Sequence, residues 1–294
     1  MRAAFATLLA VLVFGAAGCN ETSTGPRDVT APAAPRGFHS VTGDGQVRLS
    51  WLENTEADVA GYRVYMAPCA SGSSCPYDRI GSTSATQFTA DGLANGVTRY
   101  YAVAAVDHAG NESALSYEDV FDTPRPEGGA TLTDFTGAQP ANSGWDFSAF
   151  LRRSWDAAGT DIYYGDNGSV KQMFTTGVEV SPGNWLYTDI QDAGYVSSLD
   201  ALDWAPSTGW SPTGTVELIP GHAYYVWTWD DHYAKFRVTS LSPAYVEFDW
   251  AYQTDTGNGE LRARPVKTTH TTPRSPAWIR SGSGPLAGLR ADAP

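Results

Sequence analysis

Short stretches in which apolar and polar residues alternate occur throughout the first half of the chain, and they predict β-strands. Residues 46–51, 61–66 and 101–105 each place their apolar side chains on one face of a strand. Turn-forming residues at 43–45 and 95–96 separate these stretches. Several short strands at regular spacing predict a β-sandwich over residues 36–124.

The same two-residue period returns in the second half of the chain. Residues 223–229, 233–238 and 245–252 predict three strands, and the pair Asp230-Asp231 predicts a tight turn between the first two. Helical periodicity is poor, and residues 200–204 predict one helical turn at most. We therefore expect a second, mainly antiparallel β domain over residues 130–265, and an all-β protein.

Three segments lack this alternation and predict connections rather than domains. Residues 19–35 are polar and rich in proline, which is typical of a flexible tether. Residues 123–129, with the sequence TPRPEGG, predict a linker between the two β domains. Residues 266–294 are rich in Pro, Ser, Gly and Thr and predict a disordered tail.

The first 18 residues have the pattern of an export signal. Met1-Arg2 gives a positive start, and the apolar run over residues 3–17 is too short for a spanning helix. The run ends in Ala16-Ala17-Gly18-Cys19, which resembles a bacterial lipobox. This resemblance implies cleavage before Cys19, which then carries a diacylglycerol and an N-acyl (palmitate) chain that anchor the protein to a membrane. The alternative is an ordinary secretory signal followed by an unmodified cysteine.

The residue after the lipobox bears on the compartment. Position 20 is Asn and not the Asp that retains lipoproteins at the inner membrane of Gram-negative bacteria, which favours the outer membrane. If Cys19 carries lipid, Cys69 and Cys75 remain as a pair around a five-residue loop. In an exported protein this spacing predicts a disulfide, and a metal site is the alternative, although no His lies near.

Composition and charge narrow the function classes. Hydrophobic residues make up 42% and charged residues 17% of the chain, which excludes a disordered protein, and three Cys exclude a disulfide scaffold. The net charge of −13 argues against nucleic acid as a partner. Most of the negative charge lies between residues 130 and 262. This segment contains 17 Asp and Glu residues and 6 Lys and Arg residues, which gives a net charge of −11.

A set of motifs in the first predicted domain resembles the bacterial fibronectin type III family. The motifs are Val47-x-Leu49-x-Trp51, Gly61-Tyr62-x-Val64-Tyr65, Gly92-Leu93-x-Asn95-Gly96 and Ala105-Val106-Asp107-x-Ala109-Gly110-Asn111. The resemblance implies a spacer or interaction module without an active site. The family places a corner Tyr where this chain has Arg99, with Tyr100 and Tyr101 after it. Either the corner hydrogen bond is lost or the turn is shifted by one residue.

A second motif set, in the second domain, is similar to the HmuY family of bacterial surface lipoproteins. Its best part is Gly221-x-x-Tyr224-x-Val226-x-Thr228-x-Asp230-x-x-Tyr233-x-Lys235-x-x-Val238. Because some members bind haem, the resemblance makes haem a candidate cofactor. The available axial ligands are Met173, His222 and His232, and we expect the two His at opposite ends of one hairpin, roughly 30 Å apart. That separation argues against both His binding one haem.

Aromatic and acidic residues of the second domain allow other chemistry. Trp185, Trp204 and Trp210 lie in segments rich in Gly, Pro and Ser, where an exposed indole can stack on a sugar ring; the alternative is that they fill a small core. Acidic pairs such as Asp230-Asp231 permit a glycosidase, but an acidic chain supplies such pairs by chance. The segment Asp166-Asn167-Gly168 resembles part of a calcium loop but is typical of a hairpin turn.

These observations favour a surface-anchored bacterial lipoprotein that acts as a non-enzymatic binding or interaction module. Its expected partners are the membrane, through Cys19, and a protein or a carbohydrate. The alternatives are a haem-binding lipoprotein and a carbohydrate-binding or sugar-active protein. We expect no nucleic acid, no metal and no obligatory cofactor.

Overall fold

The computed structural model describes residues 27–69, 75–116, 120–202 and 204–259. Within these ranges the chain is built of β-strands, and the only helices are two single 3-10 turns, η1 (Pro140–Asn142) and η2 (Leu199–Ala201). The all-β prediction is therefore confirmed. The predicted signal peptide, residues 19–26 of the tether with Cys19, and the predicted tail lie outside the described residues.

The first domain is a sandwich of two antiparallel sheets. One sheet has the order β1 (His39–Gly43), β2 (Gln46–Ser50), β5 (Gln87–Ala90), and the other β4 (Asp78–Thr83), β3 (Val59–Ala67), β6 (Arg99–Asp107), β7 (Val120–Asp122). The predicted alternation puts Val47, Leu49 and Trp51 in the core between the sheets. This fold is the fibronectin-type-III-like sandwich that the motifs imply.

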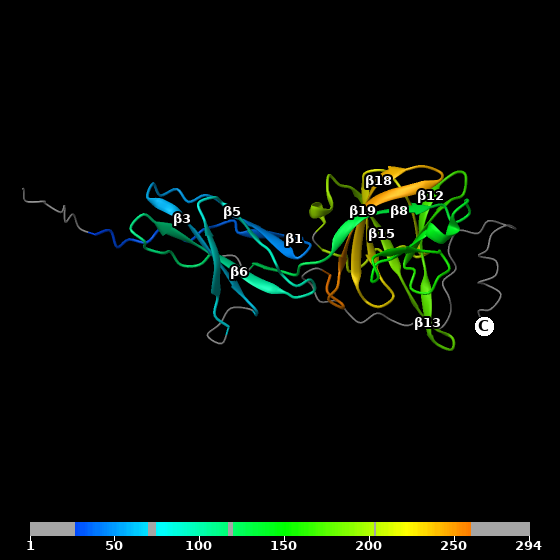
Figure 1. Cartoon of the computed structure of the whole chain (residues 1–294), viewed down its shortest axis with the longest axis horizontal. Coiled ribbons are helices and arrows are strands. Elements are labelled where there is room, and N and C mark those ends of the chain that lie inside the picture. Colours follow the sequence, from blue (N-terminus) through cyan, green and yellow to red (C-terminus); the bar gives the residue numbers. More distant parts are fainter. Residues whose placement is uncertain (1–26, 70–74, 117–119, 203, 260–294) are drawn as a thin grey trace, which may run out of the picture.

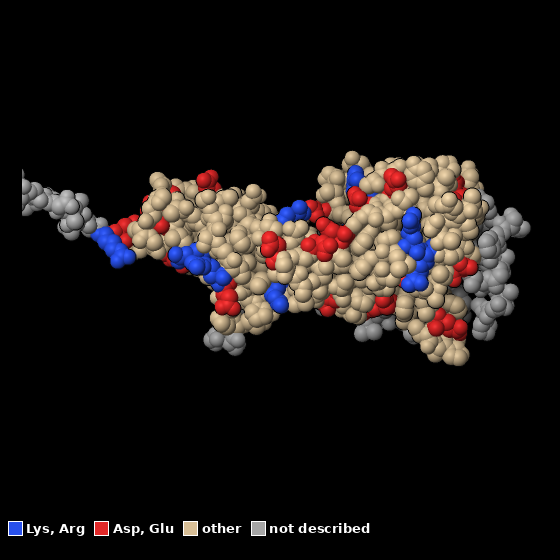
Figure 2. All heavy atoms as spheres, in the orientation of Figure 1, with Lys and Arg blue, Asp and Glu red and all other residues tan. Residues whose placement is uncertain are grey.

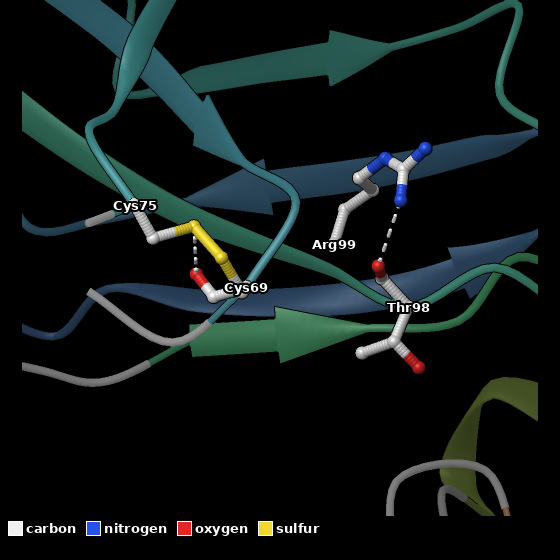
Figure 3. The surroundings of a disulfide bond; sticks show 4 residues. All are labelled: Cys69, Cys75, Thr98 and Arg99. Carbon is white, nitrogen blue, oxygen red and sulfur yellow. Dashed lines mark hydrogen bonds between the residues drawn. A yellow bond between two sulfur atoms is a disulfide. The ribbon is translucent and has the colours of Figure 1, made fainter. Parts of the chain in front are cut away.

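The corner of this sandwich lacks its usual hydrogen bond. Tyr101 is fully buried, and its hydroxyl has no hydrogen-bond partner in the described part of the chain. Arg99, at the corner position, donates from its guanidinium to the carbonyl of Thr98 at 3.1 Å (Figure 3). Nearby, a disulfide joins Cys69 and Cys75, whose Cα atoms are 6.0 Å apart (Figure 3).

The second domain packs two five-stranded antiparallel sheets face to face. One has the order β15 (Asp189–Tyr195), β17 (His222–Trp227), β18 (Tyr233–Leu241), β19 (Tyr245–Gln253), β8 (Glu127–Thr133). The other has the order β10 (Leu151–Arg153), β9 (Gly144–Asp146), β11 (Ile162–Asp166), β12 (Lys171–Thr175), β16 (Thr215–Glu217). A separate hairpin, β13 (Gly177–Ser181) and β14 (Asn184–Tyr187), projects from the domain in Figure 1.

The aromatic residues of the second domain form its core. Phe236 and Phe248 pack with ring centroids 5.2 Å apart, and Trp145 contacts both Phe248 and Trp250. Met173 is fully buried in the same core. Alternation along β19 produces this arrangement, because Val246, Phe248 and Trp250 point inward while the residues between them face solvent.

The segment between the domains differs from the flexible linker that its composition predicts. Strand β8 begins at Glu127, so residues 127–129 belong to the second sheet. Pro124 accepts a hydrogen bond from Gly96 N at 2.8 Å, which ties the segment to the first domain. Pro126 accepts one from Tyr252 N at 3.0 Å, which ties it to the second. The two domains lie end to end in Figure 1 with this short segment held from both sides.

Candidate functional site

An open groove of about 430 Å³ lies where β8 forms the edge of its sheet. We call it the edge groove. It is lined by Gly129, Ala130, Thr131, Trp145, Arg152, Thr239, Glu247, Phe248 and Asp249. The residues come from β8, β9, β10, β18 and β19, so both sheets of the second domain contribute to it.

Small residues in β8 leave room for this groove. Gly128 and Gly129 have no side chains, and a Cβ atom added at Gly128 would lie 3.1 Å from Cζ2 of Trp250. The glycine therefore allows the Trp250 ring to lie close against the strand. A bulkier residue at either position would have to displace a neighbour or fill the open edge.

The register of β8 directs backbone polar groups into the groove. Tyr252 N donates to Pro126 O and Asp134 N donates to Ala244 O, so the even-numbered residues of this segment pair with β19. The N–H and C=O groups of Gly129 and Thr131 consequently point away from β19, toward the open edge that the groove occupies. These groups are available to a bound molecule.

The side chains at the groove's rim carry uncompensated charge. Glu247 and Asp249 are two residues apart on the outer face of β19, and both are exposed. Arg152, on β10, is exposed as well. Among the described residues, none of these three side chains forms an ion pair. The groove therefore carries one positive and two negative side chains that form no ion pair among the described residues.

An aromatic stack leads from the protein surface to the groove. Phe150, which is 43% exposed, stacks on Trp250 with centroids 5.5 Å apart and planes at 10°. Trp250 in turn lies 5.5 Å from Trp145, a groove residue. Phe150 has φ = 55°, a conformation that costs a bulky residue about 1–3 kcal/mol.

Hydrogen bonds to Asp146 hold the loop that presents Phe150. The carboxylate accepts from Ser148 Oγ and Ala149 N, each at 2.9 Å, and from Arg153 Nε at 2.7 Å. Asp146 is 2% exposed, so this anchor is rigid and shielded from water. The loop thus keeps an exposed phenyl ring in a strained position beside the groove.

A second acidic residue, Asp161, lies buried near Asp146 and is not accessible to a ligand. It accepts hydrogen bonds from Phe147 N at 2.8 Å and from Thr188 Oγ1 at 3.4 Å. Burial raises the pKa of the Asp161 carboxyl well above its usual value, and the nearby charges of Asp230 and Asp146 raise it further. Asp161 thus links Phe147 and Thr188 through hydrogen bonds inside the core. It is too deeply buried to act on a substrate.

Asp230 and His232 form a partly buried pair in the turn between β17 and β18. Their closest atoms, Oδ1 and Nδ1, are 3.5 Å apart. Burial opposes ionisation of Asp230, but hydrogen bonds from His232 and Thr228 outweigh it and lower the pKa of the carboxyl. Burial also opposes protonation of His232, yet Asp230 outweighs it and raises the pKa of the imidazole. The pair therefore favours a charged state that stabilises the turn.

The three tryptophans expected to bind a ligand lie in different settings. Trp185 is on β14, stacked beside Tyr187 with centroids 6.2 Å apart. Trp210 packs against Trp227 at 6.1 Å, and Trp204 is 39% exposed in the segment after η2. None of the three lines the edge groove. Sequence composition indicated exposed indoles but did not predict the groove. Its signal in the sequence is the small residues Gly128 and Gly129 together with the outward acids Glu247 and Asp249, of which Asp249 pairs with Gly129.

The candidate haem ligands do not fit one haem site. His222 begins β17, and its Nδ1 lies 3.1 Å from Asp192 Oδ1. His232 lies in the turn beyond the other end of that strand, beside Trp227, which is opposite Tyr233. Met173 is fully buried in β12 of the other sheet. We therefore assign no residue to haem.

Hydrogen bonds within the protein engage acidic residues at two further places. Asp166, Asn167 and Gly168 form the turn between β11 and β12, with Gly168 N donating to Asp166 Oδ1 at 2.7 Å. In the first domain, the carboxylates of Asp28, Asp58 and Asp107 lie within 4.8 Å of one another. The Asp107 carboxylate is bound by Asn111 through both N and Nδ2 at 2.8 Å, and the other two residues are exposed.

Within the described ranges, no helix is both long and apolar enough to cross a membrane.

Comparisons with known proteins find partial similarity to an amylopullulanase and an exoglucanase. No family model matches the chain. An amylopullulanase of Thermoanaerobacterium thermosulfurigenes is 37% identical over 95 residues, covering 32% of this chain and 5% of the enzyme. Exoglucanase B of Cellulomonas fimi is 28% identical over 260 residues, covering 84% of this chain and 22% of the enzyme. The chain thus spans less than a quarter of the length of these relatives.

Among solved structures, an Fn3-like protein from Clostridium thermocellum is 28% identical to this chain, with a TM-score of 0.28. The match covers 31% of this chain and 92% of that protein.

Proposed function

We propose that the protein is a non-catalytic glycan-binding lipoprotein, held at the cell surface through Cys19, and that the edge groove is its binding site. The observation that carries the proposal is the groove itself. It combines outward-directed backbone groups of β8, exposed charged side chains and an adjoining aromatic stack. The fibronectin-type-III-like domain is then the arm between the anchor and the binding domain.

The chemistry of the groove suits a sugar chain. Sugars carry hydroxyl groups that both donate and accept hydrogen bonds, and their rings have apolar faces that pack on aromatic side chains. The backbone of Gly129 and Thr131 and the carboxylates of Glu247 and Asp249 supply partners for hydroxyls. The exposed ring of Phe150, which stacks on the buried Trp250, supplies an aromatic surface at the loop beside β10. The partial similarity to an amylopullulanase and an exoglucanase also supports a carbohydrate ligand.

The arrangement of carboxylates favours binding over hydrolysis. Most glycosidases use two carboxyl groups that flank the scissile bond from opposite sides. Glu247 and Asp249 extend from the same face of one strand, so they approach a ligand from one side. Asp161, whose raised pKa would suit a general acid, is buried and accepts hydrogen bonds from Phe147 N and Thr188 Oγ1, so a ligand cannot reach it.

Isothermal titration calorimetry of the purified full-length chain against soluble oligosaccharides tests this proposal. We expect a saturable heat with at least one oligosaccharide, and Asp249→Ala to weaken it about ten-fold through loss of a charge-assisted hydrogen bond. Trp204→Ala is the matched control, because Trp204 is exposed but outside the groove. Loss of binding in Trp204→Ala but not in Asp249→Ala, or no binding of any oligosaccharide, contradicts the proposal.

A further inference from the structure

We infer that a segment of this same chain, residues 266–272, adds as a further strand to the free edge of β8 and competes with the glycan for the edge groove. The inference goes beyond the proposed function, because it names a second occupant of the same edge. Three observations carry it: the unpaired backbone of β8, the sequence of the segment, and the place where the described chain ends.

The outer side of β8 carries a row of unpaired backbone groups. The register with β19 runs along the whole strand without a bulge, so alternate residues direct their N–H and C=O groups away from β19. No described residue forms a backbone hydrogen bond with the outward groups of Glu127, Gly129, Thr131 and Thr133. Such an edge is a template for another strand.

The other edges of the two five-stranded sheets are protected from such pairing. β10 and β16 have three residues each, which is short for pairing with another strand. β15 has a bulge between Asp192 and Gly194, and its Ile190 carbonyl accepts a hydrogen bond from Ser211 N at 2.8 Å. β8 has seven residues, no proline and one charged side chain, Glu127. Its unprotected edge therefore indicates that a strand pairs with it.

Residues 266–272, with the sequence VKTTHTT, have the propensity of a strand. Five of the seven are β-branched Val or Thr, and none is Gly or Pro. Pro265 and Pro273 flank the segment and limit it at both ends. Its length of seven residues equals that of β8. The tail as a whole is rich in turn residues, but this part of it is suited to pairing with an open edge.

The described chain ends close to the start of β8. Gly257 N donates to Asp231 O at 2.6 Å in the turn between β17 and β18, and Asn258 Nδ2 donates to Thr123 Oγ1 at 3.2 Å, just before β8. From β18 to a strand beyond β8 is three strand spacings, roughly 14 Å. Residue 266 lies seven positions after the last described residue, and seven extended residues span roughly 23 Å. The segment therefore reaches the free edge, and it would run parallel to β8.

The charges of the two parts of the chain favour this contact. Residues 260–294 contain six Lys and Arg and two Asp and Glu, a net charge of +4. Residues 130–259 contain five Lys and Arg and 16 Asp and Glu, a net charge of −11. Figure 2 shows acidic side chains spread over the drawn face, with Lys and Arg confined to a few places. Attraction and the covalent link together give the segment a high local concentration at the edge.

A segment paired with β8 uses the same N–H groups that a glycan would use. One added strand composed mostly of Thr buries little apolar surface, so we expect it to cover the edge for part of the time. The apparent affinity for a glycan is then lowered by the fraction of molecules whose edge is covered. A glycan at saturation displaces the segment and covers the edge continuously.

Residue-resolved hydrogen–deuterium exchange of the full-length chain, without any ligand, tests the inference. Thr268 and Thr271 direct their N–H groups to opposite sides of a strand, so replacing both with Pro removes a donor to β8 whichever way the segment faces. We expect Thr268→Pro with Thr271→Pro to speed exchange at Gly129 and Thr131 about two- to five-fold. Equal exchange at both residues in the wild type and this variant overturns the inference.

A matched control places two prolines elsewhere in the same tail. Ala287→Pro with Ala291→Pro leaves residues 266–272 unchanged, and we expect wild-type exchange at Gly129 and Thr131. Equal exchange at Phe236, in the core, checks that the fold is the same in all variants. Faster exchange at the edge in both proline variants alike would indicate diffuse attraction of the tail, and would overturn the inference.

Dilution and calorimetry separate this occupant from others. Slow exchange at the edge that is unaffected by the prolines but lost on about ten-fold dilution identifies a second copy as the occupant, and overturns the inference. We expect Thr268→Pro with Thr271→Pro to bind a soluble oligosaccharide about two- to five-fold more tightly than the control variant. Equal affinities would overturn the competition. The exchange measurement needs no glycan, so failure of glycan binding and failure of strand pairing are distinguishable.

Discussion

At the scale of single residues, Asp161 links burial to the pH dependence of folding. Its folded pKa is raised above the unfolded value, so the folded state holds a proton more tightly than the unfolded chain. The stability from this residue is therefore greatest at low pH and declines as pH rises from about 4 toward the folded pKa. We predict that Asp161→Asn, which keeps an acceptor for Phe147 N, makes the unfolding free energy fall less over that range.

Urea unfolding of the full-length chain at a series of pH values measures this effect. Asp156→Asn is the control, because Asp156 is an exposed acid in the same region. If the unfolding free energies of the wild type and Asp161→Asn change in parallel with pH, ionisation of Asp161 does not destabilise the fold. That result would contradict the prediction.

Phe150 provides a test of strain at the groove. Both Phe150→Gly and Phe150→Ala remove the ring that stacks on Trp250, but only glycine adopts the φ of 55° freely. We predict that the Gly variant is more stable than the Ala variant by about 1 kcal/mol. The difference in thermal unfolding between these two variants isolates the backbone contribution, and an Ala variant that is as stable as the Gly variant refutes stored strain.

Individual residues also show where sequence pattern is informative. The apolar faces of residues 46–51 and 245–252 were predictable, since alternation fixes which side chains point inward. The surroundings of Trp185, Trp204 and Trp210 were not predictable. Composition indicates that a segment forms a loop, but it does not indicate which residues pack against that loop. Tyr101 illustrates the same limit, since its lost corner partner depends on how the turn before β6 is shaped.

At the scale of elements, the hairpin of β17 and β18 makes a prediction about haem. His222 and His232 lie at opposite ends of β17, so they cannot bind one iron from both sides within one protomer. We predict that haemin titrated into the full-length chain gives no saturable, low-spin absorption spectrum with both His as ligands. A one-to-one spectrum abolished by His222→Ala and also by His232→Ala would contradict this placement.

Strand β8 is the element that sequence analysis assigned least well. Residues 127–129 were expected in a linker because Pro126, Gly128 and Gly129 are typical of turns. Pairing with β19 outweighs that local preference, and an edge strand tolerates glycine because one of its sides needs no partner. The wrongly assigned residues include Gly128 and Gly129, which leave room for the edge groove. The secondary-structure propensity of single residues therefore gives the wrong prediction at the candidate functional site.

At the scale of the whole molecule, the proposed function requires a lipid anchor on Cys19, a first domain that acts as an arm and a second domain that binds the ligand. We predict that Cys19→Ala shifts the protein from the membrane fraction to the soluble fraction of the producing bacterium, since lipid chains contribute about 0.8 kcal/mol per buried methylene. Immunoblots of separated fractions measure this. A mutant that remains with the membrane would show that something other than lipid on Cys19 retains it.

The first and second domains contact each other directly. Thr123 accepts a hydrogen bond from Gln253 Nε2 at 3.3 Å, and Arg48 on the first domain pairs with Asp200 on the second at 2.5 Å. A Cβ atom added at Gly96 would lie 2.5 Å from Thr254 Oγ1, so the domains are in close contact there.

Hydrogen–deuterium exchange of the full-length chain, with and without a soluble oligosaccharide that gives saturable heat in calorimetry, tests the claim that the edge groove binds glycans most directly. The account predicts slower exchange in β8, in residues 149–153 and at Gly129 and Thr131 above all, because a ligand in the edge groove would bond their outward N–H groups. Protection confined to the first domain, or to the segments around Trp185, Trp204 and Trp210, would contradict the account and move the binding site elsewhere.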